Sequence, residues 1–123
     1  MNTTHFLNID LEIESDAEIS ILVDELSLKL TKLTYHECQG KYRASFEPQK
    51  FEIEEIITEY VSVISCLSED GMKLWTACGK REFNFGFQAG ASPKGFEKSV
   101  SLHALKAIVS VGGQLGITVY SSE

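Results

Sequence analysis

Residues 5–14, HFLNIDLEIE, decide the fold, because apolar and polar side chains alternate along most of the stretch. The two sets are Leu7, Ile9, Leu11 and Ile13 against Asn8, Asp10, Glu12 and Glu14. A period of two is typical of a strand that is buried on one side only. The sequence therefore predicts a sheet strand with one buried face and one acidic, exposed face.

The segments that follow predict a helix and a hairpin. Residues 15–18 (SDAE) have the form of a capping box, and apolar residues at helical spacing follow them. Residues 28–37 and 41–47 then have the composition of two strands. Gly40 lies between them, where its backbone freedom permits a tight turn.

The middle of the chain predicts a second helix and a second hairpin. Isoleucines and other apolar residues recur at helical spacing over residues 53–67, and Asp70-Gly71 is expected to end that helix. Residues 72–78 and 81–88 are predicted to pair as strands around Gly79-Lys80. The phenylalanines of the second strand would contribute to the core.

The last third predicts a loop, a strand, a helix and a closing strand. Residues 90–95 are expected to form a mobile loop, and residues 96–100 one more short strand. Ser101 is predicted to cap a third helix that ends at Gly112-Gly113. Its buried side would be formed by Leu102, Leu105, Ile108 and Val109. Residues 115–120 make the final strand.

Together these elements predict an α+β fold. We expect one domain over residues 1–123, with a mainly antiparallel sheet and three helices packed on it. The order would be β-α-β-β-α-β-β-β-α-β, in split β-α-β type units.

Charge is unevenly distributed along the chain. The formal net charge is −7 at pH 7, and residues 1–28 hold seven acids without Lys or Arg. Residues 52–70 hold six acids and no base. Nucleic acids and anionic membranes attract clustered Lys and Arg, so we expect neither as a partner.

The lengths of the apolar segments and the number of cysteines indicate where in the cell the protein is located. No stretch has the pattern of a signal peptide or the roughly 18 apolar residues of a membrane helix. Cys38, Cys66 and Cys78 are widely spaced and odd in number, which is typical of reduced thiols. We therefore expect a cytoplasmic protein.

No set of residues has the spacing of a catalytic site. His5, His36 and His103 lie in three different predicted elements, away from any nucleophile and acid at a recognisable spacing. A zinc site would need Cys78 to lie beside His36 and Cys38, and the paired ligands of structural zinc sites are missing. We expect no enzyme activity, no metal and no other cofactor.

Two acidic rows are the most informative surface feature. Asp10, Glu12 and Glu14 share the outer face of the first strand. Glu52, Glu55 and Glu59 form a stripe on the second helix, with no Lys four positions on to relieve their repulsion. Either row serves solubility, or it faces a basic partner.

Three segments of the chain resemble a bacterial family of small domains of unknown function. They are residues 81–90 (REFNFGFQAG), residues 99–102 (SVSL) and residues 112–120 (GGQLGITVY). These signatures are structural, and the family is similar in size and acidity to the immunity proteins that bacteria pair with secreted toxins. The resemblance implies an immunity-type protein, and it implies no active-site residue.

Two functional hypotheses follow. In the first, the chain binds and neutralises a cognate protein toxin, such as a basic nuclease domain, through Asp10, Glu12, Glu14, Glu52, Glu55 and Glu59. The protein would then be a monomer or a weak homodimer. In the second, it is a regulatory domain that holds a small molecule in a pocket near Trp75 and residues 90–95.

Overall fold

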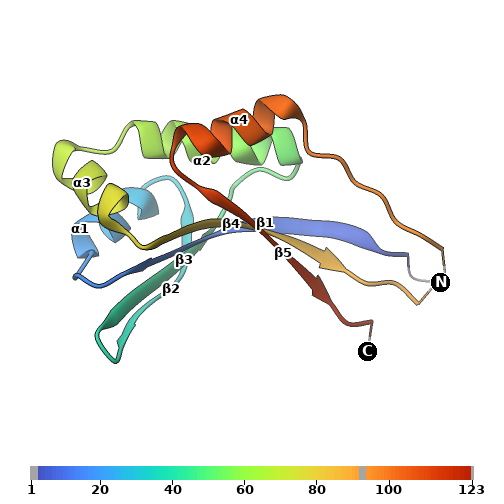
Figure 1. Cartoon of the computed structure of the whole chain (residues 1–123), viewed down its shortest axis with the longest axis horizontal. Helices are drawn as coiled ribbons and strands as arrows, with labels where there is room; N and C mark the ends of the chain where they lie inside the picture. The colour runs from blue at the N-terminus through green and yellow to red at the C-terminus, as the bar shows by residue number, and fades with distance from the viewer. Residues whose placement is uncertain (1–2, 92–93, 123) are drawn as a thin grey trace.

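The structure, a computed structural model, describes residues 3–91 and 94–122 and consists of one sheet with helices on one of its faces (Figure 1). The strands are β1 (His5–Ser15), β2 (Thr31–Cys38), β3 (Lys41–Glu47), β4 (Lys80–Gln88) and β5 (Gln114–Tyr120). The helices are α1 (Ser20–Ser27), α2 (Ile53–Ser65), α3 (Glu69–Ala77) and α4 (Leu102–Ser110). Within the described part of the chain, no helix is both long and apolar enough to cross a membrane.

The sheet has the strand order β2-β3-β1-β4-β5, with β1 in the centre. β1 is antiparallel to β3 and β4, and β2 is antiparallel to β3. Between β2 and β3, Gln39 (φ 55°) and Gly40 (φ 81°) both adopt left-handed conformations, so the tight turn predicted at Gly40 is confirmed. β5 runs parallel to β4, and α4 connects the two.

The core lies between the sheet and the helices, as the alternation in β1 predicts. Ile9, Leu11 and Ile13 are buried, and the polar residues between them lie on the open face of the sheet. Leu7, expected on the buried face, is 45% exposed, because the register with β4 shifts between Phe6 and Asn8. Tyr60 of α2 is fully buried above the buried residues of β1, and its hydroxyl donates to the carbonyl oxygens of Ile9 (2.7 Å) and Phe46 (3.2 Å). This hydrogen bonding fixes α2 across the two central antiparallel strands.

The prediction of three helices is wrong, because the strand expected at residues 72–78 is the helix α3. Ser68 caps α3, and its hydroxyl accepts from the backbone N–H of Gly71 (3.0 Å). Gly71 and Trp75, four positions apart, are the buried residues of this helix. Gly79-Lys80 therefore leads from a helix into β4, and there is no second hairpin at this point.

The element order is therefore β-α-β-β-α-α-β-α-β. Asp70-Gly71 lie inside α3 and do not end α2, which stops at Ser65. Among the described residues between 94 and 100, none belongs to a strand, because this segment has no neighbour in the sheet. The loop predicted at residues 90–95 includes residues 92–93, which lie outside the described residues.

The capping box predicted at residues 15–18 is wrong. Ser15 is the last residue of β1, and its hydroxyl accepts from the N–H of Ala17 (3.1 Å). Ile19 occupies the N-cap position of α1 without a side-chain cap, and the carboxylate of Glu18 accepts from the N–H of Ser20 (2.8 Å). The Ser15 hydroxyl, which the capping box would have used, therefore forms a local turn at the end of β1.

The buried side predicted for the last helix is largely wrong. Ser101 caps α4, as predicted, by accepting from the N–H of Ala104 (3.0 Å). Ala104 and Ile108 are buried, whereas Leu102, Leu105 and Val109 are exposed. The small side chain of Ala104 lets α4 lie close to α2, so the stripe of Leu102, Leu105 and Val109 faces outward.

Arg81 ties the ends of two helices to the start of β4. Its Nη1 donates to the carbonyl oxygens of Trp75 (3.1 Å), Thr76 (2.8 Å) and Cys78 (3.1 Å). Its Nε donates to the carbonyl oxygen of Gly112 (2.9 Å), just beyond α4. The last turn of a helix leaves carbonyl groups without partners, and a cation there is favourable.

Candidate functional site

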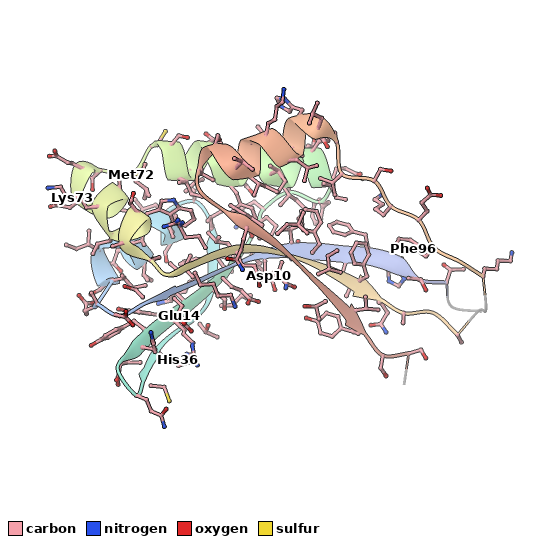
Figure 2. All side chains as sticks on the ribbon, viewed as in Figure 1. Asp10, Glu14, His36, Met72, Lys73 and Phe96 are labelled. Atoms are coloured by element: carbon pink, nitrogen blue, oxygen red, sulfur yellow. The ribbon has the colours of Figure 1, made fainter. Side chains whose placement is uncertain are left out.

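The two predicted acidic rows lie on opposite sides of the molecule. Asp10, Glu12 and Glu14 alternate with the buried residues of β1, so they lie on the face of the sheet that the helices leave open. Figure 2 shows Glu14 on this side of the sheet, with His36. Glu55 and Glu59 belong to α2, and Glu52 is its N-cap residue, so this row lies in the helix layer. A single rigid partner surface therefore meets one row or the other.

Basic residues of neighbouring strands pair with the β1 row. Arg43 of β3 lies 2.5 Å from Glu14, and Lys80 of β4 lies 3.5 Å from Glu12 and 3.7 Å from Glu82. The hydrogen bond from Arg43 lowers the pKa of Glu14 from its ordinary value. These contacts neutralise much of the negative charge on the open face.

Asp10 is the exception in this row. Partial burial, together with the nearby charges of Glu47 and Glu12, raises its pKa to about 6. Asn8 supplies a hydrogen bond, from Nδ2 to Oδ1, at 3.4 Å. The folded protein therefore holds a proton on Asp10 more tightly than the unfolded chain does.

Replacing Asp10 with asparagine should stabilise the protein at pH 7 and not at pH 4. Because the folded-state pKa is about 6 and the ordinary value is 3.8, the wild type loses stability as pH rises between these values. We expect Asp10→Asn to raise the free energy of unfolding by about 1 kcal/mol at pH 7, with allowance for solvent screening. Urea unfolding at both pH values measures the difference.

The matched control is Asp24→Asn, on the exposed side of α1. It should leave the free energy of unfolding within about 0.5 kcal/mol of wild type, as surface substitutions usually do. A gain from Asp10→Asn that is equally large at pH 4 would contradict the assignment, because protonated aspartic acid and asparagine are both neutral.

The α2 row lacks such compensation. Among the described residues, no Lys or Arg lies within ion-pair distance of Glu52, Glu55 or Glu59. Glu59 accepts a hydrogen bond from the backbone N–H of Gln49 (2.8 Å), which anchors the loop before α2. Glu55 is exposed. The stripe predicted from sequence is therefore present as an acidic helix face.

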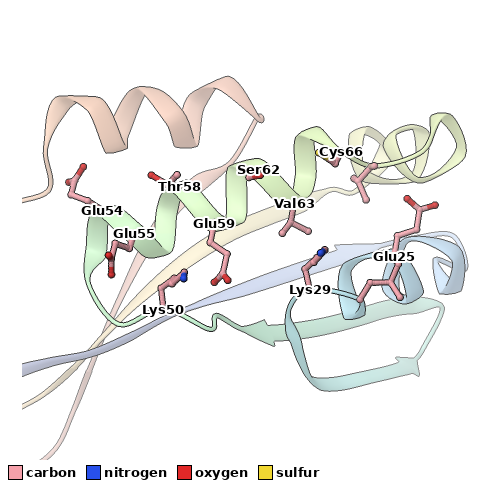
Figure 3. Close-up of a pocket in the computed structure, with 12 residues that line it drawn as sticks. Glu25, Lys29, Lys50, Glu54, Glu55, Thr58, Glu59, Ser62, Val63 and Cys66 are labelled. Carbon is pink, nitrogen blue, oxygen red and sulfur yellow. The ribbon is translucent and has the colours of Figure 1, made fainter.

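This helix face forms one wall of a groove of about 700 Å³, shown in Figure 3. The opposite wall comes from the end of α1 and the loop before α2. Charged residues surround the groove: Glu25, Lys29, Lys50, Glu54, Glu55 and Glu59. Smaller and apolar residues complete it: Leu28, Thr58, Ser62, Val63, Cys66 and Leu67. Leu28 is 79% exposed, which is unusual for a large apolar side chain.

One end of the groove is built by Glu25 of α1. Its carboxylate accepts from the backbone N–H of Ser68 (2.8 Å) and from the Ser68 hydroxyl (2.5 Å). These hydrogen bonds lower the pKa of Glu25 and fix the start of α3 against α1. The groove therefore has a rigid end and a preformed shape.

The chemistry of the groove suits a ligand with both a charged and an apolar part. An apolar lining gives contact area, and the glutamates beside it attract positive charge. Lys29 and Lys50 add positive charge on the other wall, so a ligand there meets both signs. In the described ranges, no three His, Cys, Asp or Glu residues come together to hold a metal ion.

Several residues of the groove were not identified from the sequence. Lys29 and Lys50 come from two separate segments, and only folding brings them to the α2 stripe, whereas Cys66 is the C-cap residue of α2 itself. Leu28 was predicted to begin a strand, whereas it caps the end of α1. An apolar residue directly after a predicted helix was the one sequence feature that could have indicated Leu28 as part of a binding groove.

Among the described residues, Trp75 and the loop predicted at residues 90–95 do not line one pocket. Trp75 is 2% exposed, and its Nε1 donates to the carbonyl oxygen of Val111 (2.9 Å). It lines a separate hollow of about 310 Å³ with Arg81. β4 begins near Trp75 and ends just before Ala89, so the strand separates Trp75 from that loop.

The arrangement considered for zinc is also absent. Cys78 lies at the end of α3, where burial raises the pKa of its thiol to about 11, and its Sγ donates to the carbonyl oxygen of Leu74 (3.3 Å). Cys38 is exposed at the tip of the β2–β3 hairpin. The hairpin that was expected to bring these cysteines together is the helix α3.

Comparisons with known proteins do not assign the chain to a family. No protein-family model matches it, and no curated protein and no solved structure shows significant similarity. The resemblance to a bacterial family of small domains stays a prediction, and functional inference depends on the groove and its charges.

Proposed function

We propose that this protein is an immunity-type inhibitor, which binds a cognate protein toxin through the α2 groove. The observation that carries the proposal is the stripe of Glu52, Glu55 and Glu59, without ion-pair partners among the described residues, beside an apolar groove. A toxin that acts on nucleic acid needs a basic cleft for its phosphate substrate. An acidic helix face is complementary to such a cleft.

The charge on α2 favours a partner over mere solubility. Glu55 and Glu59 lie one turn apart in α2, and their repulsion costs a few tenths of a kcal/mol, so a Lys in place of Glu59 would make the helix more stable. A basic partner removes this repulsion on binding. It also speeds the encounter, because opposite potentials raise association rates.

The apolar lining supplies the rest of the binding energy. Leu28, Val63 and Leu67 lie beside the charges and offer contact area to an apolar side chain of the partner. Interfaces commonly combine an apolar centre with a polar rim. We therefore expect a toxin segment in which Lys or Arg flanks an apolar anchor.

The β1 row has a secondary place in the proposal. Glu12 and Glu14 already pair with Lys80 and Arg43, so a basic partner would have to compete with those contacts. We therefore expect the α2 row to control binding, with Asp10, Glu12 and Glu14 outside the main contact.

The test is co-expression with the toxin encoded at the same locus, combined with measured association rates. Wild type should restore growth and form a complex whose association rate falls as salt rises. The variant Glu52→Gln/Glu55→Gln/Glu59→Gln should slow association at least about tenfold, the lower bound of electrostatic steering. Glutamine keeps an oxygen for the hydrogen bond from Gln49.

A matched control removes the same charge elsewhere. Asp24→Asn/Glu69→Gln/Glu97→Gln alters three exposed acids outside the groove and should leave association within about threefold of wild type. Failure of the wild type to restore growth or to bind would overturn the proposal. Loss of binding only in Asp10→Asn/Glu12→Gln/Glu14→Gln would move the contact to the open sheet face.

The size of the groove also favours a second candidate, the binding of a small molecule. Ligand pockets commonly measure about 300–1,000 Å³, and this groove falls in that range. A ligand with a positively charged group and an apolar body would fit its lining. A rise in melting temperature with a metabolite, which Glu55→Gln removes, would support this candidate over the toxin.

A further inference from the structure

β5 is an edge strand without the features that usually protect an edge. Residues 114–120, QLGITVY, contain no charged residue and no proline. The opposite edge, β2, carries Lys32 and Glu37 and has an irregular register between Lys32 and Thr34. Charges and bulges are the usual means by which proteins prevent edge-to-edge pairing. The backbone groups at the open edge of β5 are therefore available to pair with another strand.

The direction of the backbone groups follows from one hydrogen bond. The carbonyl oxygen of Tyr120 accepts from the N–H of Ala89 (2.9 Å), so Tyr120 points its backbone groups to the β4 side. Backbone groups alternate sides along a strand. The N–H and C=O groups of Leu115, Ile117 and Val119 consequently point away from β4, toward the open edge.

The same three residues present apolar side chains. They pair in register with Phe83, Phe85 and Phe87 of β4, so they share the helix-covered face of the sheet. Ile117 is nevertheless 65% exposed. α4, which contacts β5 and leads into it, adds an exposed stripe formed by Leu102, Leu105 and Val109. In Figure 1, α4 lies over the β5 side of the sheet.

The charge around the β5 edge favours a second copy of this chain as its binding partner. The protein has a net charge of −7, so two copies repel each other over most of their surfaces. Residues 101–122 contain no Asp or Glu, and Lys106 is their one Lys or Arg. Two identical faces of this kind meet without like-charge repulsion along the strand.

We propose that two copies associate through β5, antiparallel, around a two-fold axis at Ile117. In this register Ile117 faces Ile117 of the second copy, and Leu115 faces Val119. Each of these residues directs its N–H and C=O across the axis, so the pairs exchange backbone hydrogen bonds. The sheet then continues from one copy into the other, with the two α4 helices near the axis.

The exposed area is sufficient for such a contact. Large apolar side chains of α4 and β5 are 39–72% exposed: Leu102, Leu105, Val109, Leu115, Ile117, Val119 and Tyr120. Complete burial of their remaining exposed surface would remove roughly 700 Å² per copy, so together with the strand backbone they approach the about 800 Å² per partner of a standard interface. The α2 groove opens on the α1 side of α2, so both grooves stay accessible.

Analytical ultracentrifugation with a charge-swap pair tests the proposal. Wild type should shift from monomer to dimer as its concentration is raised through the range of about 1–100 µM, where transient interfaces are half-occupied. Ile117→Lys and Ile117→Glu should each be monomeric, with the Kd raised at least about 100-fold, because like charges then meet at the axis. An equimolar mixture of the two variants should form a heterodimer.

Mixing the Lys and Glu variants tests the register. Opposite charges restore the dimer only if residue 117 of one copy faces residue 117 of the other. Leu33→Lys, an exposed position on the β2 edge, is the matched control and should dimerise like wild type. Circular dichroism shows that each variant is folded. A wild type that stays monomeric throughout, or single variants that still dimerise, would overturn the proposal, as would a mixture that stays monomeric.

Discussion

Replacing Arg81 with methionine should lower the free energy of unfolding by about 3 kcal/mol, since hydrogen bonds from a charged group each contribute about 1.5–3 kcal/mol and are not additive. The guanidinium group donates to four backbone carbonyl oxygens, three at the end of α3 and one at Gly112. Methionine keeps much of the apolar stem and removes every donor. Those carbonyl groups would then have to find water or remain without partners.

Urea unfolding followed by the fluorescence of Trp75 measures the effect, because Trp75 lies directly beside Arg81. Lys80→Met is the matched control, since it removes a neighbouring positive charge whose ion pairs with Glu12 and Glu82 are partly exposed. Its cost should stay below about 1 kcal/mol. Equal urea midpoints for the two variants would show that Arg81 acts only as a surface charge.

Replacing Tyr60 with alanine should cost about 4 kcal/mol, the largest effect that we expect from a single substitution. Tyr60 is 0% exposed, and its ring packs against Phe83 with centroids 5.4 Å apart. Alanine would leave a cavity under α2 and would remove the hydroxyl bonded to the carbonyl oxygens of Ile9 and Phe46. Burial raises the pKa of Tyr60, so this hydroxyl stays protonated and able to donate.

Tyr60→Phe separates the two contributions. It keeps the ring and removes the hydroxyl, and it should cost about 1–2 kcal/mol because two buried carbonyl groups lose a donor. Tyr42→Phe, at a half-buried position of β3, should change the free energy of unfolding by less than about 0.5 kcal/mol. A Tyr60→Phe protein as stable as wild type would show that water replaces the lost donor.

The strands with clear alternation were predicted well, because their pattern depends on a single buried face. β1 and β3 lie where residues 5–14 and 41–47 were expected to form strands, within one residue. α3 was missed because Asp70 and Gly71 have the composition of a turn. In the structure they form a first helical turn, which Ser68 caps and Glu25 of α1 holds in place.

The orientation of α4 shows a further limit of periodicity. Its sequence carries one stripe of large apolar residues, at Leu102, Leu105 and Val109, and a second one at Ala104 and Ile108. Hydrophobicity alone favours the first stripe for the core. The close packing of α4 against α2 favours the stripe of Ala104 and Ile108. How closely two helices pack depends on the assembled fold and cannot be seen in the periodicity of one helix.

The candidate site was predicted in part. The α2 stripe follows from helical spacing, so Glu55 and Glu59 were identified without a structure. The facing lysines lie in loops, and their approach to α2 depends on how α1 and the β3–α2 connection pack. The neutralisation of Glu12 and Glu14 depends on strand order, because Lys80 and Arg43 come from the two strands beside β1.

The central position of β1 has a consequence for how the chain folds. β1 is made first during synthesis, yet Leu11 pairs with Phe83, which emerges much later. Closing so long a loop costs entropy before its contacts contribute, and folding rates fall as such pairings increase. Until β4 arrives, one edge of the central strand has no neighbour, so the growing chain passes through a stage in which that edge is open to pairing with other chains.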